Sequence, residues 1–143
     1  MTRQADEAAI RSIIENTNDA HRALEAHAIV APYEPDAVLF DLAPPLARRI
    51  DAEQVAAWLA TWDGPVVRSV RDLDISVGGD LAFATFFVHT SAVTRDTKEP
   101  AEWWARTTMC FERIEREWRI VHEHVSVPFY MDGTFRAALD LQP

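Results

Sequence analysis

The chain has 143 residues, of which 48% are hydrophobic, and both values are typical of one globular domain spanning residues 1–143. The net charge of −9, without a basic stripe, argues against nucleic acid as a partner. No apolar run approaches the roughly 20 residues that span a bilayer, and the single cysteine excludes an internal disulfide. The acidic N-terminal segment lacks a signal-peptide pattern, so we expect a cytoplasmic protein.

The first half of the chain predicts two helices on either side of a short strand. Apolar residues recur at helical spacing over residues 4–28, which indicates one amphipathic helix. Residues 37–41 read as a buried strand, and the prolines at 44–45 require a loop because they cannot donate to a sheet. Asp51 resembles the first residue of a capping box, and it opens a second helix that ends at residues 64–65.

The second half of the chain predicts four strands. Val- and Ile-rich segments with alternating polarity cover residues 66–77, 81–93, 103–114 and 118–127. Short turns join them, so we expect an antiparallel meander. Residues 132–141 suggest a short terminal helix. Two helices that cover only part of one sheet face would leave a cavity between the helices and the sheet.

Three segments carry the motifs of a known superfamily. Residues 33–41 have the pattern Y-x-x-D-A-V-x-x-D, residues 79–84 resemble a strand opening, and residues 118–126 have the pattern W-x-x-V-H-x-H-x-S. These motifs resemble SnoaL-like and ketosteroid-isomerase-like proteins of the nuclear-transport-factor-like superfamily. The last motif also resembles the end of the calmodulin-dependent kinase association domain.

This resemblance implies an α+β fold of the cystatin-like type. The expected architecture is a cone-shaped barrel of a curved antiparallel sheet covered by N-terminal helices. The resemblance also implies a pocket at the wide end of the cone and a homodimer joined through the sheet. Members of the superfamily include isomerases, polyketide cyclases, epoxide hydrolases, dehydratases and proteins without known catalysis, so the fold alone does not decide the function.

Strand alternation proposes which side chains face the expected pocket. Residues two apart share a face, and similarity to ketosteroid isomerase assigns these faces to the cavity, through Phe87, His89, Trp103, Met109, Phe111, His122 and His124. A bulge would reverse the assignment beyond it. Tyr33, Phe40, Trp58 and Phe129 would add an aromatic lining and phenol donors, although helix-to-sheet core is the alternative for the tryptophan.

Asp41 and the histidines of the last strand are the candidate catalytic residues. Asp41 falls where the resemblance places the general base of ketosteroid isomerase, and with His122 or His124 it would form an acid–base couple. The alternatives are a loop aspartate that caps a turn and histidines bonded within the core. The His-x-His spacing also permits a zinc site but does not require one, so we predict no metal.

The sequence departs from the catalytic patterns of known members. The oxyanion donors of the isomerase correspond to Met109 or Thr108 and to Thr17 or Asn18, which argues against steroid isomerisation. An epoxide hydrolase would need an Asp-Arg-Asp relay, and strand alternation turns Arg106 outward.

Three functions therefore remain open. The first is an isomerase, cyclase or hydrolase that acts on a small apolar or polycyclic substrate. No phosphate-binding loop or dinucleotide fingerprint occurs, so we expect no organic cofactor. The second is a carrier of a hydrophobic metabolite, and the third is a dimerisation or assembly domain.

Overall fold

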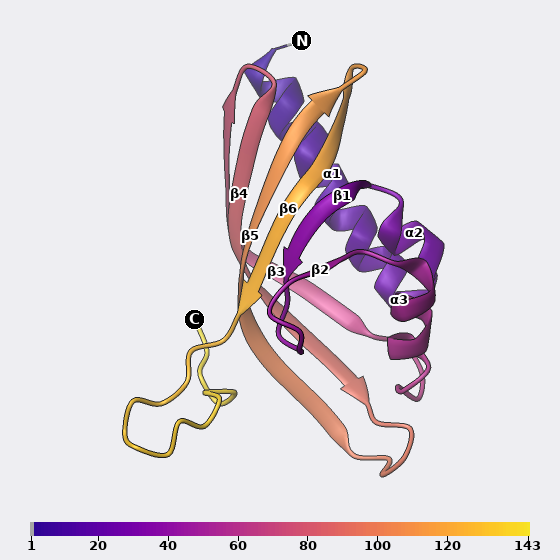
Figure 1. Cartoon of the computed structure of the whole chain (residues 1–143), viewed down its shortest axis with the longest axis vertical. Helices are drawn as coiled ribbons and strands as arrows, with labels where there is room; N and C mark the ends of the chain where they lie inside the picture. The colour runs from indigo at the N-terminus through magenta and orange to yellow at the C-terminus, as the bar shows by residue number, and fades with distance from the viewer. Residues whose placement is uncertain (1) are drawn as a thin grey trace.

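Three helices lie on one side of a six-stranded sheet that is curved but not closed (Figure 1). The computed structural model describes residues 2–143. The strands follow one another across the sheet in the order β2-β1-β6-β5-β4-β3. The elements in chain order are α1 (Arg3–Arg22), α2 (Ala26–Val30), β1 (Tyr33–Phe40), β2 (Arg48–Arg49), α3 (Ala52–Leu59), β3 (Val67–Gly78), β4 (Leu81–Val93), β5 (Pro100–Ile114) and β6 (Glu117–Ser126).

The sheet confirms the predicted α+β fold and differs from the prediction in one pairing. β3 to β6 form the expected antiparallel meander. β1 lies parallel to β6 and carries the two-residue strand β2 on its other side, so the sheet is mixed rather than wholly antiparallel. β5 begins at Pro100 rather than at Trp103.

The predicted helix over residues 4–28 is wrong in its extent, because the chain turns at Leu24. This residue has φ 57°, in the left-handed region that ends helices. The Glu25 N–H donates to the Ala20 carbonyl across the turn, and α2 follows as a separate short helix. The capping prediction is confirmed, since the Asp51 carboxylate accepts from the backbone N–H groups of Glu53 and Gln54.

The predicted helix over residues 132–141 is also wrong. Gly133 has φ 88° and Phe135 has φ 53°, and neither value is compatible with a right-handed helix. The segment instead folds back on itself, with the Tyr130 N–H donating to the Arg136 carbonyl. In Figure 1 this yellow segment projects away from the helices.

The main core lies between α1 and the concave face of the sheet. Ile10 and Ile14 of α1 are almost fully buried against β5 and β6, where they meet Met109, Phe111 and Ile120. A smaller cluster joins α2, α3 and the start of β3, with Val66 at its centre.

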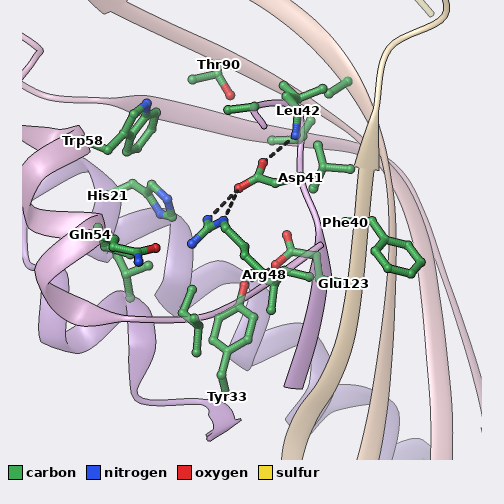
Figure 2. Close-up of a pocket in the computed structure, with 18 of the residues that line it drawn as sticks. His21, Tyr33, Phe40, Asp41, Leu42, Arg48, Gln54, Trp58, Thr90 and Glu123 are labelled. Carbon is green, nitrogen blue, oxygen red and sulfur yellow. Dashed lines mark hydrogen bonds and ion pairs between the residues drawn. The ribbon is translucent and has the colours of Figure 1, made fainter. Parts of the chain in front are cut away.

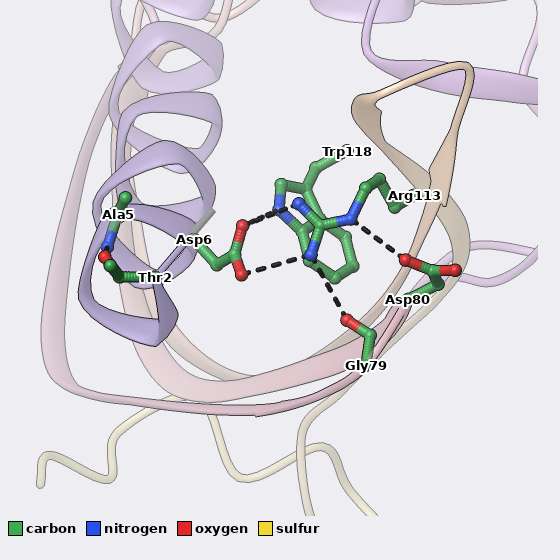
Figure 3. A network of polar contacts seen from close by, with 7 residues as sticks. All are labelled: Thr2, Ala5, Asp6, Gly79, Asp80, Arg113 and Trp118. Atoms are coloured by element: carbon green, nitrogen blue, oxygen red, sulfur yellow. Dashed lines mark hydrogen bonds and ion pairs between the residues drawn. The ribbon is translucent and has the colours of Figure 1, made fainter.

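A polar network fixes the first turn of α1 to the sheet (Figure 3). Arg113 donates to both carboxylate oxygens of Asp6, at 2.7 and 3.1 Å, and to Asp80 at 3.0 Å. The Trp118 indole also donates to Asp6, and the guanidinium lies 4.4 Å above the indole ring. The hydrogen bonds from Arg113 lower the pKa of the Asp6 carboxyl, so this buried acid is held in its charged form.

Candidate functional site

A cavity of about 410 Å³ lies between the sheet, the end of α1, α2, α3 and the loop after β1 (Figure 2). Its wall is mainly apolar, and a few polar side chains converge on it. The residues that line it are His21, Ile29, Tyr33, Leu39, Phe40, Asp41, Leu42, Ala43, Pro44, Pro45, Arg48, Ile50, Gln54, Val55, Trp58, Arg68, Val88, Thr90, Trp103, Ala105, Glu123 and Val125.

Glu123 is a buried carboxyl in the wall of this cavity. It lies on β6 opposite Met109 of β5, and only 7% of its surface is exposed. The Tyr33 hydroxyl donates to its Oε2 atom, and no hydrogen bond to Oε1 occurs within residues 2–143. Burial raises the pKa of Glu123, and the hydrogen bond from Tyr33 and the charge of Arg68 act in the opposite direction. Burial and the neighbouring Glu123 raise the pKa of Tyr33 well above its ordinary value.

Asp41 faces the cavity, but its partner is an arginine. Arg48 of β2 donates to Asp41 Oδ2 from Nη2 at 2.6 Å and from Nε at 3.1 Å. The Leu42 backbone N–H donates to the other carboxylate oxygen at 2.7 Å. Figure 2 shows these bonds among the side chains that line the cavity. The predicted Asp41–histidine couple does not form, because within residues 2–143 the hydrogen-bond partners of Asp41 are Arg48 and Leu42, and no histidine is among them.

His21 and Arg68 form a second polar pair in the wall. His21 Nδ1 lies 2.7 Å from the Thr17 carbonyl and so carries the proton, and Arg68 Nη1 lies 3.2 Å from Nε2, the acceptor nitrogen, and 3.3 Å from Nδ1. Burial, followed by the charge of Arg68, lowers the pKa of His21 to about 3. The imidazole is therefore neutral and serves to position Arg68.

His122 and His124 do not face the cavity, so their predicted placement is wrong. Ile120 pairs with Phe111, but His122 pairs with Cys110, so Val121 is an extra residue in β6. This bulge reverses the alternation and brings Glu123 inward. His122 instead donates to the Val38 carbonyl at 2.6 Å, and both histidine rings contact the ring of Phe40 on the outer face.

The predicted face of β4 is also reversed, which moves Phe87 and His89 away from the cavity. β4 residues opposite the inward side chains of β5 are even-numbered, as the pair Val88 and Ala105 shows. His89 instead lies against Trp104 on the outer face, with ring centroids 5.0 Å apart. The concave face of β4 carries Ala84, Phe86 and Val88, which are buried in the main core.

Three other predicted lining residues lie elsewhere, and a fourth borders the cavity with its ring turned away. Met109 and Phe111 do face inward, but they are 2% and 1% exposed in the core under α1 and do not reach the cavity. Phe129 lies exposed in the C-terminal segment, next to Phe135. Phe40 borders the cavity, but its ring points away from it (Figure 2).

Five predicted residues line the cavity: Tyr33, Phe40, Asp41, Trp58 and Trp103. Trp58 is 39% exposed and lies at the rim on α3. The titratable lining residues that sequence reasoning missed are His21, Arg48, Arg68 and Glu123. No local signal marks Arg68, because β3 carries other charged residues, and strand alternation alone turned Glu123 outward.

The buried His21 makes a prediction for the pH dependence of stability. Its pKa is about 3 in the fold and 6.5 ordinarily, so below pH 6.5 the unfolded chain binds a proton that the folded chain does not. The contribution of neutral His21 to the free energy of unfolding is fully present above pH 6.5 and is lost as the pH falls toward 3. Between pH 7 and pH 4.5, urea unfolding should show the wild type losing about 1–3 kcal/mol more than His21→Gln.

The exposed His27 supplies the control for this measurement. His27→Gln should follow the wild-type pH dependence, because this side chain is exposed and makes no contact with the His21–Arg68 pair. Equal slopes for His21→Gln and the wild type would contradict the assignment of a neutral, buried His21.

The fold and the cavity define the class of this protein: an α+β cone of the nuclear-transport-factor-like type with a hollow under its helices. The chain belongs to the SnoaL-like domain family, whose model matches residues 10–130. No curated protein matches it. No helix in residues 2–143 combines the length and apolarity needed to span a membrane, and no cluster of three potential metal-ligating acidic, histidine or cysteine residues occurs in this range.

Solved structures with the same fold cover nearly the whole chain. An NTF2-like protein of unknown function from Pseudomonas putida is 29% identical over 100% of both chains, with a TM-score of 0.84. A proposed NTF2-like dehydratase from Streptomyces avermitilis is 14% identical, with a TM-score of 0.73 over 87% of this chain and 97% of its own. A proposed aromatic ring hydroxylase from Novosphingobium aromaticivorans is 15% identical, with a TM-score of 0.73 over 88% and 91%.

Proposed function

We propose that this protein is an enzyme that transfers a proton on a small, mainly apolar organic substrate, with Glu123 as the proton-transferring group. One observation carries the proposal: a buried carboxyl with a free oxygen stands in the wall of an apolar cavity of about 410 Å³. A carboxylate in such a place is poorly solvated, so it is a stronger base than in water.

The neighbouring groups suit a reaction that begins at an acidic C–H bond. Glu123 Oε1 would take the proton, while Tyr33 holds Oε2 and fixes the orientation of the carboxyl. The electron pair would move onto a substrate oxygen, where the guanidinium of Arg48 or Arg68 would stabilise the charge. Return of the proton to another atom gives isomerisation, and loss of hydroxide gives dehydration. Neither reaction needs an organic cofactor.

The relatives support a reaction of this kind. The protein from Streptomyces avermitilis that shares this fold is described as a dehydratase, which must also remove a proton from its substrate. Membership of the SnoaL-like family agrees with a site for small molecules under the helices. We therefore extend acid–base chemistry to this chain. Glu123 takes the role that the sequence analysis assigned to Asp41 and a histidine.

The test is the ring opening of 5-nitrobenzisoxazole, which requires only a desolvated base beside an apolar cavity and releases a coloured phenolate. The purified wild type should accelerate this reaction above acetate at equal carboxylate concentration, with saturation by the substrate. The rate should rise with pH through a midpoint above 4.5, since burial raises the pKa of Glu123.

A carrier function is the competing interpretation, and the apolar wall favours it. Trp58 and Trp103 would hold a hydrophobic ligand whether or not a reaction follows. If 5-nitrobenzisoxazole quenches tryptophan fluorescence with saturation but opens no faster than in acetate, the protein is a carrier and the proton-transfer proposal is wrong.

A further inference from the structure

Arg68 is a cation in the cavity wall that lacks an acidic partner. It comes from the start of β3, and its side chain is partly buried there. Its guanidinium bonds to the His21 imidazole, and no carboxylate among residues 2–143 lies within ion-pair distance of it. Arg48, by contrast, is paired with Asp41. The charge of Arg68 does reach the cavity, because it lowers the pKa of Glu123.

The neutral His21 holds this guanidinium in place without neutralising it. The imidazole accepts one N–H of Arg68 through Nε2 and is itself anchored to the Thr17 carbonyl. A guanidinium has five N–H donors in a fixed planar fork, so most of the donors of Arg68 remain for another partner. The planar fork matches two oxygen atoms of one carboxylate.

The surroundings of Arg68 set the chemistry of the rest of the ligand. The cavity wall next to β3 and β4 carries Val88 and Thr90, and Trp58 and Trp103 extend the apolar surface. The protein as a whole carries a net charge of −9, so an anion gains nothing from the overall field. Binding of an anion here depends on this one local cation and on apolar contact area.

We infer that the ligand is an apolar carboxylic acid, bound with its carboxylate on the Arg68–His21 pair and its hydrocarbon or aromatic body against Trp58 and Trp103. The inference rests on the proposed function, since it names the substrate class for the same cavity.

Binding of 2-naphthoate and 2-naphthamide tests this inference, because the two probes share a ring system and differ in charge. Both can be followed through the fluorescence of the cavity tryptophans. The wild type should bind 2-naphthoate at least about 10-fold more tightly than the neutral amide, as expected for one charge-assisted hydrogen-bonded pair. Equal affinities, or tighter binding of the amide, would overturn the inference.

Substitution of Arg68 should remove the preference for the acid. In Arg68→Gln the affinity for 2-naphthoate should fall at least about 10-fold, to that of the amide, and Arg68→Lys should keep part of the preference. Arg71→Gln is the matched control, since Arg71 lies three residues along the same strand, is exposed, and does not line the cavity. A preference that survives in both Arg68 variants would show that another group binds the carboxylate.

The two proposals fail by different measurements. The wild-type rate with 5-nitrobenzisoxazole, a neutral probe, reports on proton transfer and needs no anion site. The preference for 2-naphthoate reports on the anion site and needs no turnover, so Glu123→Gln should retain it. If the wild type opens 5-nitrobenzisoxazole but does not prefer 2-naphthoate to 2-naphthamide, only the inference of a carboxylic-acid ligand is wrong. If it prefers 2-naphthoate but does not open 5-nitrobenzisoxazole, only the proposed proton-transfer function is wrong.

Discussion

Replacing Glu123 by glutamine should lower the rate of 5-nitrobenzisoxazole opening by about 10²–10⁴-fold, the usual share of a general base. Glutamine has the shape of glutamate, and its carbonyl can still accept the hydrogen bond from the Tyr33 hydroxyl. The substitution therefore removes the base and keeps the cavity. The rate should be measured at saturating substrate, and circular dichroism should confirm that the variant is folded.

His124→Gln is the matched control for this experiment. His124 is the next residue on β6, but its ring lies on the outer face against Phe40. The variant should keep the wild-type rate. An unchanged rate in Glu123→Gln, or an equal loss in His124→Gln, would contradict the site described here and restore the histidines as catalytic residues.

Stability gives a second measurement on the same Glu123 variant. Burial raises the pKa of Glu123 in the fold, so above its ordinary value of 4.5 the unfolded chain releases this proton more readily. Glu123 thus destabilises the fold at neutral pH and does not do so below about pH 4.5. Glu123→Gln should raise the Tm at pH 7 by roughly 2–4 °C, and this gain should disappear in acid.

Phe111→Ala should destabilise the fold by about 3–5 kcal/mol, the range for removal of a buried phenylalanine ring. The ring is 1% exposed, and it packs in the core between α1 and the sheet. The Tm should fall by about 10–20 °C for a chain of this size. Urea unfolding followed by circular dichroism measures the free energy directly.

The binding of 2-naphthamide separates a core role of Phe111 from the lining role that the sequence suggested. The folded fraction of Phe111→Ala should bind this probe as the wild type does, because the ring lies outside the cavity. Phe135→Ala is the control, since this ring is 64% exposed and should cost less than about 1 kcal/mol. If Phe111→Ala loses binding of 2-naphthamide but little of its free energy of unfolding, Phe111 lines the cavity after all.

Local signals in the sequence were sufficient for most of the fold. The turn at Gly78–Gly79 and the alternation on either side of it place β3 and β4 to within one residue. The Asp51 cap likewise marks the start of α3. The end of α1 could not be predicted, because leucine at position 24 favours a helix and takes its left-handed conformation only in the folded chain.

The candidate site was harder to predict, because it depends on the curvature of the sheet. On β4, the face with Phe87 and His89 was expected to point inward, but the even-numbered residues do so, among them Ala84, Phe86 and Val88. On β6, no residue near Val121 predicts a bulge. The one extra residue reverses the alternation, so that Glu123 faces inward and the two histidines face outward. Arg68 was missed because charged residues in strands usually face water.

The bulge at Val121 divides β6 into two stretches, one that packs in the core and one that contributes to the cavity wall. Before it, Trp118 and Ile120 serve the packing of α1, and a change there would alter how the helix seats on the sheet. After it, Glu123 and Val125 supply part of the wall of the cavity. Substitutions after Val121 therefore change the chemistry of the cavity wall, while the residues before Val121 continue to hold α1 on the sheet.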